Sequence, residues 1–395
     1  MLKLVFFFPF SRCFDKYNCE PYIHKYFERT DADLIQVQIV SRHGARTPLH
    51  LSPKLSNIWT CSNTELSSQQ RNVSNFIHAH VSFGRSVFNG NCHFGQLIGK
   101  GVESLNRMGV YLRNIYVHQM KFLPSKYHSK VMKLRSTHTL RTIHSQMAII
   151  NGLYPGEKNV IIETADKNYD PWRRTSLVCP KLKFFFENLT GTSEWISMGL
   201  QNETIMRSFE EKLGIKWNSV HDIATSAMCQ KLPLPPNITE SMIDDALRLK
   251  SRQHQYLYNH DKIFPLFFGF QAADLLNEML DRINGKSSKK FIHWSAHDGN
   301  INAFLGYLGY VDSVWPPYGS FITIELLKFR KEGTLFLQFR YNGRIIRIPR
   351  FSFNKIIPFS EFQKFVNDHI PTLFEDCGFN NTDFRFTDTS ISDNF

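Results

Sequence analysis

The segment Arg42–Pro48, which reads RHGARTP, constrains the fold of this chain most strongly, because it places a histidine between two arginines directly after a predicted strand. Apolar and polar residues alternate over positions 34–40, which is the period of a β-strand. In open α/β sheets ligands bind at the carboxyl ends of the strands, and Gly44 permits the sharp turn that presents its neighbours there. The sequence therefore predicts an α/β sheet with His43 at its edge.

The residue types at this edge are suited to binding phosphate. The imidazole of His43 can act as a nucleophile. The guanidinium groups of Arg42 and Arg46 offer forked, permanently charged donors to phosphoryl oxygens. A solvated basic turn is the alternative in a chain with a net charge of +12, but the spacing of two arginines around one histidine favours a phosphate site.

A second segment, 289–300 (KKFIHWSAHDGN), also places polar residues just after a predicted strand. Its β-prone run ends before His297 and Asp298, and a helix is expected over 300–308. Taken alone, Asp298 near a helix N-terminus is equally well interpreted as a structural cap. Its partnership with the first segment favours a functional role.

A third segment, 131–137 (VMKLRST), predicts a strand that ends at Arg135. Apolar residues at spacings of three and four follow from position 140, which predicts an amphipathic helix with a buried stripe. Arg141, near the start of this helix, is interpreted as a structural ion-pair or capping residue.

Together the three segments resemble the signature of the histidine acid phosphatase family. The resemblance implies that neutral His43 attacks a phosphomonoester and forms a phosphohistidine, while Asp298 protonates the departing alcohol oxygen; water then completes the turnover. No metal or cofactor is expected, since arginines supply the positive charge that a cation supplies elsewhere. The phosphate-binding residues that the resemblance implies are Arg42, Arg46, Arg135 and His297.

The resemblance and the order of the predicted elements imply an α/β fold, with a central mixed sheet flanked by helices and an inserted, smaller, mainly helical cap lobe. Residues 30–171 and 263–395 are predicted to form the core, and residues 172–262 the cap. Asn342-Gly343 predicts a hairpin turn. The elements expected in the second core segment are an apolar helix over 263–283 and strands over 320–329, 334–341 and 344–348.

The seven cysteines are spread singly through the chain, with no Cys-x-x-Cys or His-Glu-x-x-His pattern, so a zinc site is not expected. Their connectivity cannot be read from the sequence alone. The resemblance implies a disulfide between Cys179 and Cys377, and the second pairing we expect is Cys61 with Cys92. Such bonds would imply an oxidising compartment.

Several features bear on localisation. The apolar run at 4–10 lacks a clear small-residue cleavage site and is far shorter than the roughly 20 residues that a membrane span needs. We expect the secretory pathway (Golgi, lysosome or secreted), with a cytoplasmic protein as the alternative, and leave membrane association open. The N-x-Ser/Thr glycosylation sites that support the secretory route are Asn72, Asn188, Asn202, Asn237 and Asn380.

The excess of basic residues suggests a different class of function, a catalytically inactive or non-enzymatic protein that binds a polyanion such as a glycan or an inositol phosphate. The basic residues are scattered, with modest clusters at 286–290 and 340–350, and the chain has no nucleic-acid-binding motif. The intact candidate site favours an enzyme, because an idle site has no need of so many arginines beside one histidine.

The expected partner is therefore a phosphomonoester, either a small molecule or a phosphorylated glycan, and not a nucleic acid. Cys61 and Cys92 are similar to those of the 2-phosphoxylose phosphatases of the secretory pathway, although an acidic residue commonly stands in that subgroup at the position of Ala45. The Arg-Ser-Thr at 135–137 looks more like that of the prostatic, lysosomal and lysophosphatidate phosphatases. A homodimer is left open, since several family members are dimers.

Overall fold

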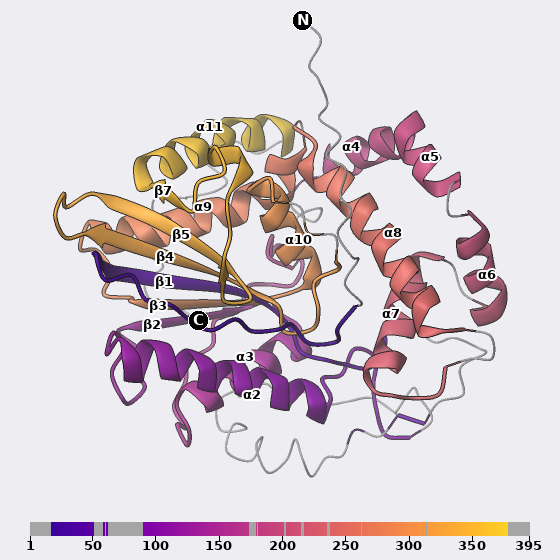
Figure 1. Ribbon diagram of the computed structural model, residues 1–395, viewed down its shortest axis with the longest axis horizontal. Coiled ribbons are helices and arrows are strands. Elements are labelled where there is room, and N and C mark those ends of the chain that lie inside the picture. The colour runs from indigo at the N-terminus through magenta and orange to yellow at the C-terminus, as the bar shows by residue number, and fades with distance from the viewer. Residues whose placement is uncertain are drawn as a thin grey trace, which may run out of the picture.

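The described residues of the chain form one mixed β-sheet of seven strands, in the order β2-β3-β1-β4-β5-β6, with β7 paired to β5 (Figure 1). The computed structural model describes residues 17–50, 58–59, 61, 90–173, 179, 181–200, 203–214, 217–234, 238–261, 263–310, 312 and 314–377. The strands are β1 (Ala32–Arg42), β2 (Met132–Ser136), β3 (Phe291–Ala296), β4 (Phe321–Phe329), β5 (Leu335–Tyr341), β6 (Arg344–Ile345) and β7 (Ile356–Pro358).

Strand β3 lies between β1 and β2 and runs parallel to both. Its register pairs Ala296 with Arg42 of β1, and Ser295 with Ser136 of β2. The carboxyl ends of all three strands therefore lie at the same edge of the sheet. This confirms the predicted α/β sheet, and it brings the three sequence segments that follow these strands to one place.

The other half of the sheet is antiparallel. Strand β4 pairs with β1 on the side opposite β3, and β5 pairs with β4. Asn342 and Gly343, with positive φ angles of 49° and 83°, form the predicted hairpin turn between β5 and β6. The C-terminal strands thus return beside β1 and complete a core built from both ends of the chain.

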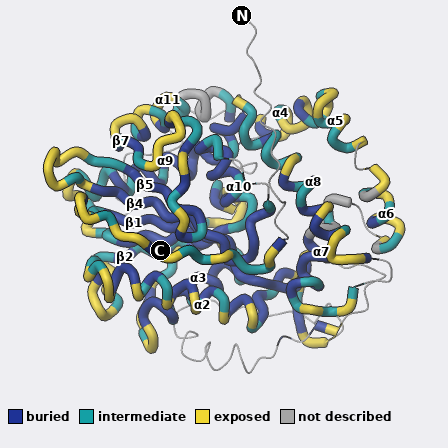
Figure 2. Tube along the Cα trace, in the orientation of Figure 1, coloured by how far each residue is buried: buried dark blue, intermediate teal, exposed yellow. Residues whose placement is uncertain are grey.

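Helices cover both faces of the sheet (Figure 1). Ile39 packs in the apolar cluster with α2 and α3, whereas the next residue, Val40, packs in the cluster with α9, α10 and α11. This alternation is the strand period seen in the sequence, and it leaves the central strands buried (Figure 2). The helices of the two layers are α2 (Gly99–Arg113), its continuation as a π-helix (Asn114–Gln119), α3 (Leu140–Leu153), α9 (Phe264–Ile283), α10 (Asp298–Tyr307) and α11 (Phe359–Cys377), with a 3₁₀ turn at Pro349–Phe351.

The apolar helix predicted over 263–283 is α9, which packs against α10 and α11 in the interior of the core. Its apolar character is explained by this burial on several sides. Among the helices of the described residues, none is long and apolar enough to cross a membrane.

The inserted segment 172–262 is helical wherever its described residues form regular structure, as predicted. Figure 1 shows its helices beside the edge of the sheet that follows β1 and β3. Helix α8 packs against α7 and against α9 and α10 of the core. The division of the chain into core and cap stays a prediction. The helices of this segment are α4 (Lys181–Thr190), α5 (Ser193–Leu200), α6 (Glu203–Leu213), α7 (Trp217–Cys229) and α8 (Glu240–Asn259).

Three disulfides join distant parts of the described chain. The expected pairs Cys179–Cys377 and Cys61–Cys92 are both confirmed. A third bond, Cys19–Cys229, was not predicted; it fastens the N-terminal segment to the end of α7. Cys13 lies outside the described residues. Three such bonds indicate a protein of the secretory pathway or the extracellular space.

One arginine of the basic cluster predicted at 340–350 lies inside the protein. Arg340 and Glu325 are 2% and 1% exposed, and Arg340 Nε lies 2.9 Å from Glu325 Oε2. Tyr26 and Tyr116 donate their hydroxyls to Glu325 Oε1 at 2.7 and 3.2 Å. Arg340 therefore belongs to the interior of the sheet and is not available to a surface that binds polyanions.

Candidate active site

Three chain segments meet where the parallel strands end. The His43 backbone N–H donates to Ala296 O at 3.1 Å, and the Thr137 N–H donates to Ser295 O at 3.0 Å. The residues that follow β1, β2 and β3 are thus held side by side by main-chain hydrogen bonds. The ring centroids of His43 and His297 lie 5.5 Å apart.

His43 is 1% exposed, and its Nδ1 lies 2.9 Å from the carbonyl oxygen of Gly44. A carbonyl oxygen only accepts hydrogen bonds, so Nδ1 carries the proton and Nε2 keeps its lone pair. Burial, followed by the positive charges of Arg141, Arg46 and Arg42, lowers the pKa of His43 well below its usual value. The imidazole is therefore neutral, with Nε2 available as a nucleophile.

Gly44 is required by the close approach of helix α2 to this loop. A Cβ at position 44 would lie 2.7 Å from the carbonyl oxygen of Gly101 and 2.8 Å from Leu105 Cδ1. The Gly44 N–H also donates to Ser145 Oγ of α3 at 3.1 Å. The glycine after the histidine thus lets the loop pack against two helices, which fixes the direction of the imidazole.

The guanidinium of Arg42 lies between Asp298 and an aromatic ring. Its Nη2 is 2.8 Å from Asp298 Oδ2, its Nη1 donates to Pro316 O at 2.5 Å, and it stacks 4.1 Å from the ring centroid of Tyr318. Burial opposes its charged form, but the Asp298 carboxylate raises the pKa of Arg42 above its usual value. Arg42 therefore stays charged in a buried position.

Arg46 is held by a carboxylate that the sequence analysis did not find. Arg46 Nη1 lies 2.6 Å from Oδ1 of Asp222 in α7, and the Leu49 N–H donates to Oδ2 of the same residue at 2.5 Å. Burial opposes the charge on Arg46, but Asp222 raises its pKa above the usual value. A helix of the inserted segment thus orients an arginine of the core.

His297 has a different neighbour at each ring nitrogen. Its Nε2 lies 3.0 Å from Thr137 Oγ1, and its Nδ1 lies 3.4 Å from Arg141 Nη2. A guanidinium only donates, so Nδ1 is the acceptor and Nε2 carries the proton. Burial, followed by the charge of Arg141, lowers the pKa of His297 well below its usual value.

Arg141 does not occupy the structural position that the sequence suggested for it. No carboxylate of the described residues contacts its guanidinium, and its buried Nε has no hydrogen-bond partner among them. Burial, and then the charge of Arg46, lowers its pKa to about 10. The charges of Asp298 and Asp222 act in the opposite direction but do not offset burial. Arg141 is thus a buried cation beside both histidines that forms no ion pair among the described residues.

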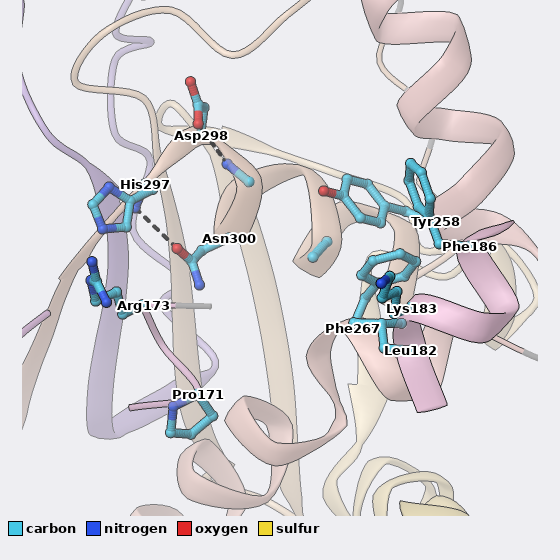
Figure 3. Close-up of a pocket in the computed structure, with 12 residues that line it drawn as sticks. Pro171, Arg173, Leu182, Lys183, Phe186, Tyr258, Phe267, His297, Asp298 and Asn300 are labelled. Carbon is cyan, nitrogen blue, oxygen red and sulfur yellow. Dashed lines mark hydrogen bonds between the residues drawn. The ribbon is translucent and has the colours of Figure 1, made fainter. Parts of the chain in front are cut away.

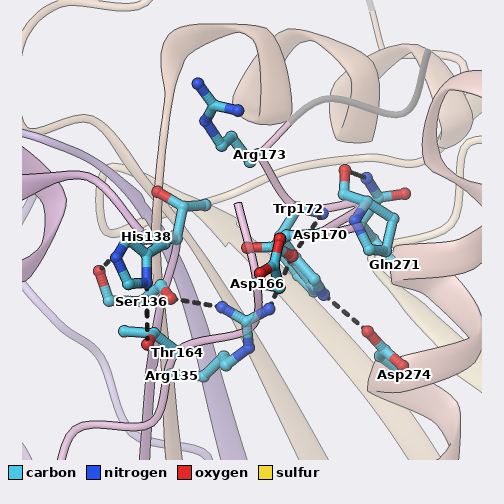
Figure 4. A network of polar contacts seen from close by, with 12 residues as sticks. Arg135, Ser136, His138, Thr164, Asp166, Asp170, Trp172, Arg173, Gln271 and Asp274 are labelled. Atoms are coloured by element: carbon cyan, nitrogen blue, oxygen red, sulfur yellow. Dashed lines mark hydrogen bonds and ion pairs between the residues drawn. The ribbon is translucent and has the colours of Figure 1, made fainter. Parts of the chain in front are cut away.

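Arg135, by contrast, is directed at a buried carboxylate (Figure 4). Its Nη2 lies 2.6 Å from Oδ1 of Asp170, a residue with no exposed surface, and its Nη1 donates to Ser136 O. Asp170 Oδ1 also accepts from the Trp172 N–H at 3.1 Å. Among the described residues, no hydrogen bond or ion pair joins Arg135 to His43 or His297, and its place in the phosphate site stays a prediction.

Asp298 is the first residue of α10, and His297 is its N-cap. Besides Arg42, Asp298 Oδ2 has Trp315 Nε1 at 3.3 Å, and Oδ1 accepts from the Gly299 N–H at 2.9 Å. The carboxylate is partly exposed, at 23%. Both the functional and the capping interpretation of Asp298 therefore have a geometric basis.

Asp298 lines two hollows of very different volume. A hollow of about 10 Å³ on one side is lined by polar residues that include Arg42, Arg46 and Asp222. A cavity of about 520 Å³ on the other side reaches from His297 and Asp298 to helix α4 (Figure 3). Within the described part of the chain, no cluster of three or more His, Cys, Asp or Glu side chains is arranged to hold a metal ion.

Comparison with known proteins identifies the family. The model of the histidine phosphatase superfamily (branch 2) matches residues 33–193. Counting factor 60 of Dictyostelium discoideum is 31% identical over 340 residues, which cover 79% of this chain and 80% of that protein. The chain belongs to the histidine acid phosphatase family.

Two further proteins are similar to this chain. Lysophosphatidic acid phosphatase type 6 of Mus musculus is 24% identical over 359 residues, which cover 85% of each chain. The phytase of Hafnia alvei, solved in complex with myo-inositol hexakis sulphate, is 16% identical with a TM-score of 0.61, and the match covers 87% of this chain and 98% of the phytase. The phytase likeness shows a shared fold. Family membership makes this protein an enzyme that hydrolyses phosphomonoesters through a phosphohistidine intermediate.

Proposed function

We propose that His43 is the nucleophile of this phosphatase and Asp298 its proton donor. Nε2 of His43 forms a bond to phosphorus as the bond from phosphorus to the alcohol oxygen breaks, and Asp298, in its protonated carboxylic acid form, gives its proton to that oxygen. Water then attacks the phosphohistidine, which releases phosphate, frees His43 and returns a proton to Asp298. The observation that carries the proposal is the neutral His43 with its Nε2 unprotonated beside three arginines.

The phosphate-binding set that we propose differs from the sequence prediction at one position. Arg42, Arg46 and His297 remain in it, and Arg141 takes the place of Arg135. A dianionic phosphate would supply the anion that Arg141 lacks, whereas Asp170 already neutralises Arg135. The sequence did contain a signal for Arg141. It lies in the first turn of a helix that follows a strand, and the N-terminus of such a helix is suited to binding anions.

We further propose that the protein works in the Golgi, in a lysosome or outside the cell, on a small phosphomonoester. Its three disulfides support an oxidising compartment. The names of its relatives cover a lysophosphatidic acid phosphatase and phytases, and both substrate types are phosphomonoesters. A phosphorylated glycan as substrate, membrane association and a homodimer stay open.

Hydrolysis of p-nitrophenyl phosphate between about pH 4 and pH 8, in excess chelator, tests the two roles. His43→Ala should abolish turnover, while His118→Ala, a change of an exposed histidine on the π-helix, should not. Asp298→Asn should slow an alkyl phosphate more than p-nitrophenyl phosphate, because the alkoxide needs a proton to leave. Equal turnover by His43→Ala and the unchanged protein would refute the nucleophile, and equal slowing of both substrates would refute the proton donor.

A further inference from the structure

The cavity of about 520 Å³ adjoins the candidate proton donor, Asp298. His297 and Asp298 line it, but His43, Arg42 and Arg46 do not. Arg42 and Arg46 instead line the small hollow on the other side of Asp298. If Asp298 protonates the departing oxygen, the alcohol part of the substrate extends from Asp298 into the larger cavity. This step rests on the proposed function.

Apart from Lys183, the far wall of this cavity is aliphatic or aromatic. Figure 3 shows Leu182, Phe186, Tyr258 and Phe267 on the side opposite His297 and Arg173. The rings of Tyr258 and Phe267 pack edge to face, with centroids 4.4 Å apart. A cavity of this size accommodates a whole small-molecule ligand, and such a wall lowers the free energy of an apolar chain that leaves water.

One aromatic side chain of this wall is left in contact with solvent. Phe186 is 42% exposed and lies with its ring centroid 6.3 Å from that of Trp195 in α5. An aromatic ring at the rim of a cavity stays partly in water until a ligand covers it. An apolar ligand that covers Phe186 therefore removes apolar surface from water, which favours binding.

The fixed charges of the lining do not suit a substrate with many phosphates. Among the described residues that line this cavity, the cationic side chains are Arg173 and Lys183. Lys183 is 82% exposed, and its Nζ lies 3.8 Å from Glu187 Oε1. Hydroxyl or phosphate groups of a polyol placed against the apolar wall would lose water without gaining hydrogen bonds, which costs free energy.

We propose that the preferred substrates of this phosphatase are monoesters of alcohols with an alkyl chain, and that the chain lies along Leu182, Phe186 and Phe267. The phosphate sits among the arginines on one side of Asp298, the ester oxygen lies at Asp298, and the chain fills the cavity between α4, α8 and α9. The wall formed by α4 thus sets the specificity of the enzyme, while the chemistry is that of the family.

The test is a series of soluble n-alkyl phosphates from ethyl to octyl, each below the concentration at which it forms micelles. The second-order rate constant kcat/KM should rise about two- to fourfold per methylene, the effect expected for transfer of a methylene into an apolar site. Propyl phosphate should exceed glycerol 3-phosphate, which has the same three carbons and two hydroxyls, by about tenfold. Octyl phosphate should also exceed myo-inositol hexakisphosphate.

Two neighbouring phenylalanines of α4 provide a matched pair of variants. Phe186 lines the cavity, whereas Phe184 is 57% exposed and is not part of its lining. Phe186→Ala should lower the ratio of octyl to ethyl phosphate kcat/KM by about tenfold, while Phe184→Ala leaves this ratio unchanged. Both residues are exposed enough for the variants to fold, which circular dichroism would verify.

The outcomes separate this proposal from the proposed function. If p-nitrophenyl phosphate and ethyl phosphate are turned over but kcat/KM does not rise with chain length, the alkyl-chain proposal is overturned and the phosphatase mechanism stands. A glycerol 3-phosphate or inositol phosphate preference, or an equal effect of Phe184→Ala and Phe186→Ala, also overturns it. If none of the monoesters is hydrolysed, both proposals fail together.

Discussion

Replacement of Arg141 by methionine is expected to lower activity while raising stability. Methionine keeps the length and apolar character of the side chain and removes the guanidinium. In the proposed site this loses one or two charge-assisted hydrogen bonds to phosphate, each worth about 1.5–3 kcal/mol. The expected loss in kcat/KM is therefore about 10²- to 10³-fold.

The gain in stability follows because Arg141 is buried and forms no ion pair with a carboxylate among the described residues. Burial lowers the pKa of Arg141 to about 10, so the folded protein disfavours the charged form by about 3 kcal/mol. Removal of the charge relieves part of this cost, and the free energy of unfolding of Arg141→Met should rise by about 1–3 kcal/mol. Inorganic phosphate, which stabilises the folded state by binding it, should protect the variant less than the unchanged protein.

Arg135→Met is the matched comparison: it should lower stability and leave kcat/KM nearly unchanged. It leaves the carboxylate of Asp170 buried without its cation, which costs about 3–5 kcal/mol of unfolding free energy. Its kcat/KM, measured where the variant is fully folded, should change by less than about threefold, a difference well under 1 kcal/mol.

Urea unfolding, with and without phosphate, measures the stability of the two variants. The kinetics of p-nitrophenyl phosphate hydrolysis, at a temperature well below the unfolding transition of each variant, measure their kcat/KM. The reasoning is refuted if Arg135→Met loses about 10²-fold in kcat/KM while folded, since Arg135 would then be the phosphate ligand. It is equally refuted if Arg141→Met keeps its activity and loses stability, which is the behaviour of a structural ion-pair or capping residue.

Three further predictions concern the scaffold. The double change Cys19→Ser and Cys229→Ser opens a disulfide that spans 210 residues and should lower the free energy of unfolding by about 3–5 kcal/mol in a urea titration; no loss would show that the N-terminal segment is held by other contacts. Arg340→Met should cost about 3–5 kcal/mol in the same titration because it leaves Glu325 buried and unpaired, whereas a neutral result would contradict that account. Burial lowers the pKa of His293 to about 3. Below about pH 6.5 the unfolded chain therefore binds a proton at this histidine and the folded protein does not. The free energy of unfolding should fall from pH 6.5 towards pH 3. Urea midpoints measured across this range check the prediction, and His293→Gln should flatten the slope.

Much of the core could be predicted because its strands have simple patterns. The segments 34–40, 131–136 and 289–296 are each followed by polar residues, and the parallel register of β1, β2 and β3 places those ends at one edge. Strand β7 was not predicted because three residues that include Pro358 show no period. Helix α11 was not predicted either, and its interior proline at position 371 breaks the helical signal.

The alternation of residues in β2 already indicates which face of the sheet Arg135 is on, and this distinguishes it from Arg141 as a phosphate ligand. In β2, Lys133 and Arg135 alternate with buried residues and share one face. Both are paired with acids, Lys133 with Glu278 of α9 and Arg135 with Asp170. Strand alternation therefore turns Arg135 towards the α9 side of the sheet, whereas Arg141 begins a helix on the other side, directly after the strand end.

The carboxylates that pair with the arginines were out of reach of sequence reasoning. Asp222 lies 176 residues after Arg46 and on a helix of the inserted segment, so no local pattern joins them. Yet these carboxylates determine which arginine charges are already neutralised when a phosphate binds. Arg42 has Asp298, Arg46 has Asp222 and Arg135 has Asp170, whereas Arg141 forms no ion pair with a carboxylate among the described residues. A phosphate dianion that enters the site thus meets one cation without an ion-pair partner, Arg141, and two cations, Arg42 and Arg46, that carboxylates orient. This arrangement limits the free-energy cost of burying the arginines, since each buried charge without a partner destabilises the folded state by several kcal/mol, about 3–5 kcal/mol when a buried pair is broken.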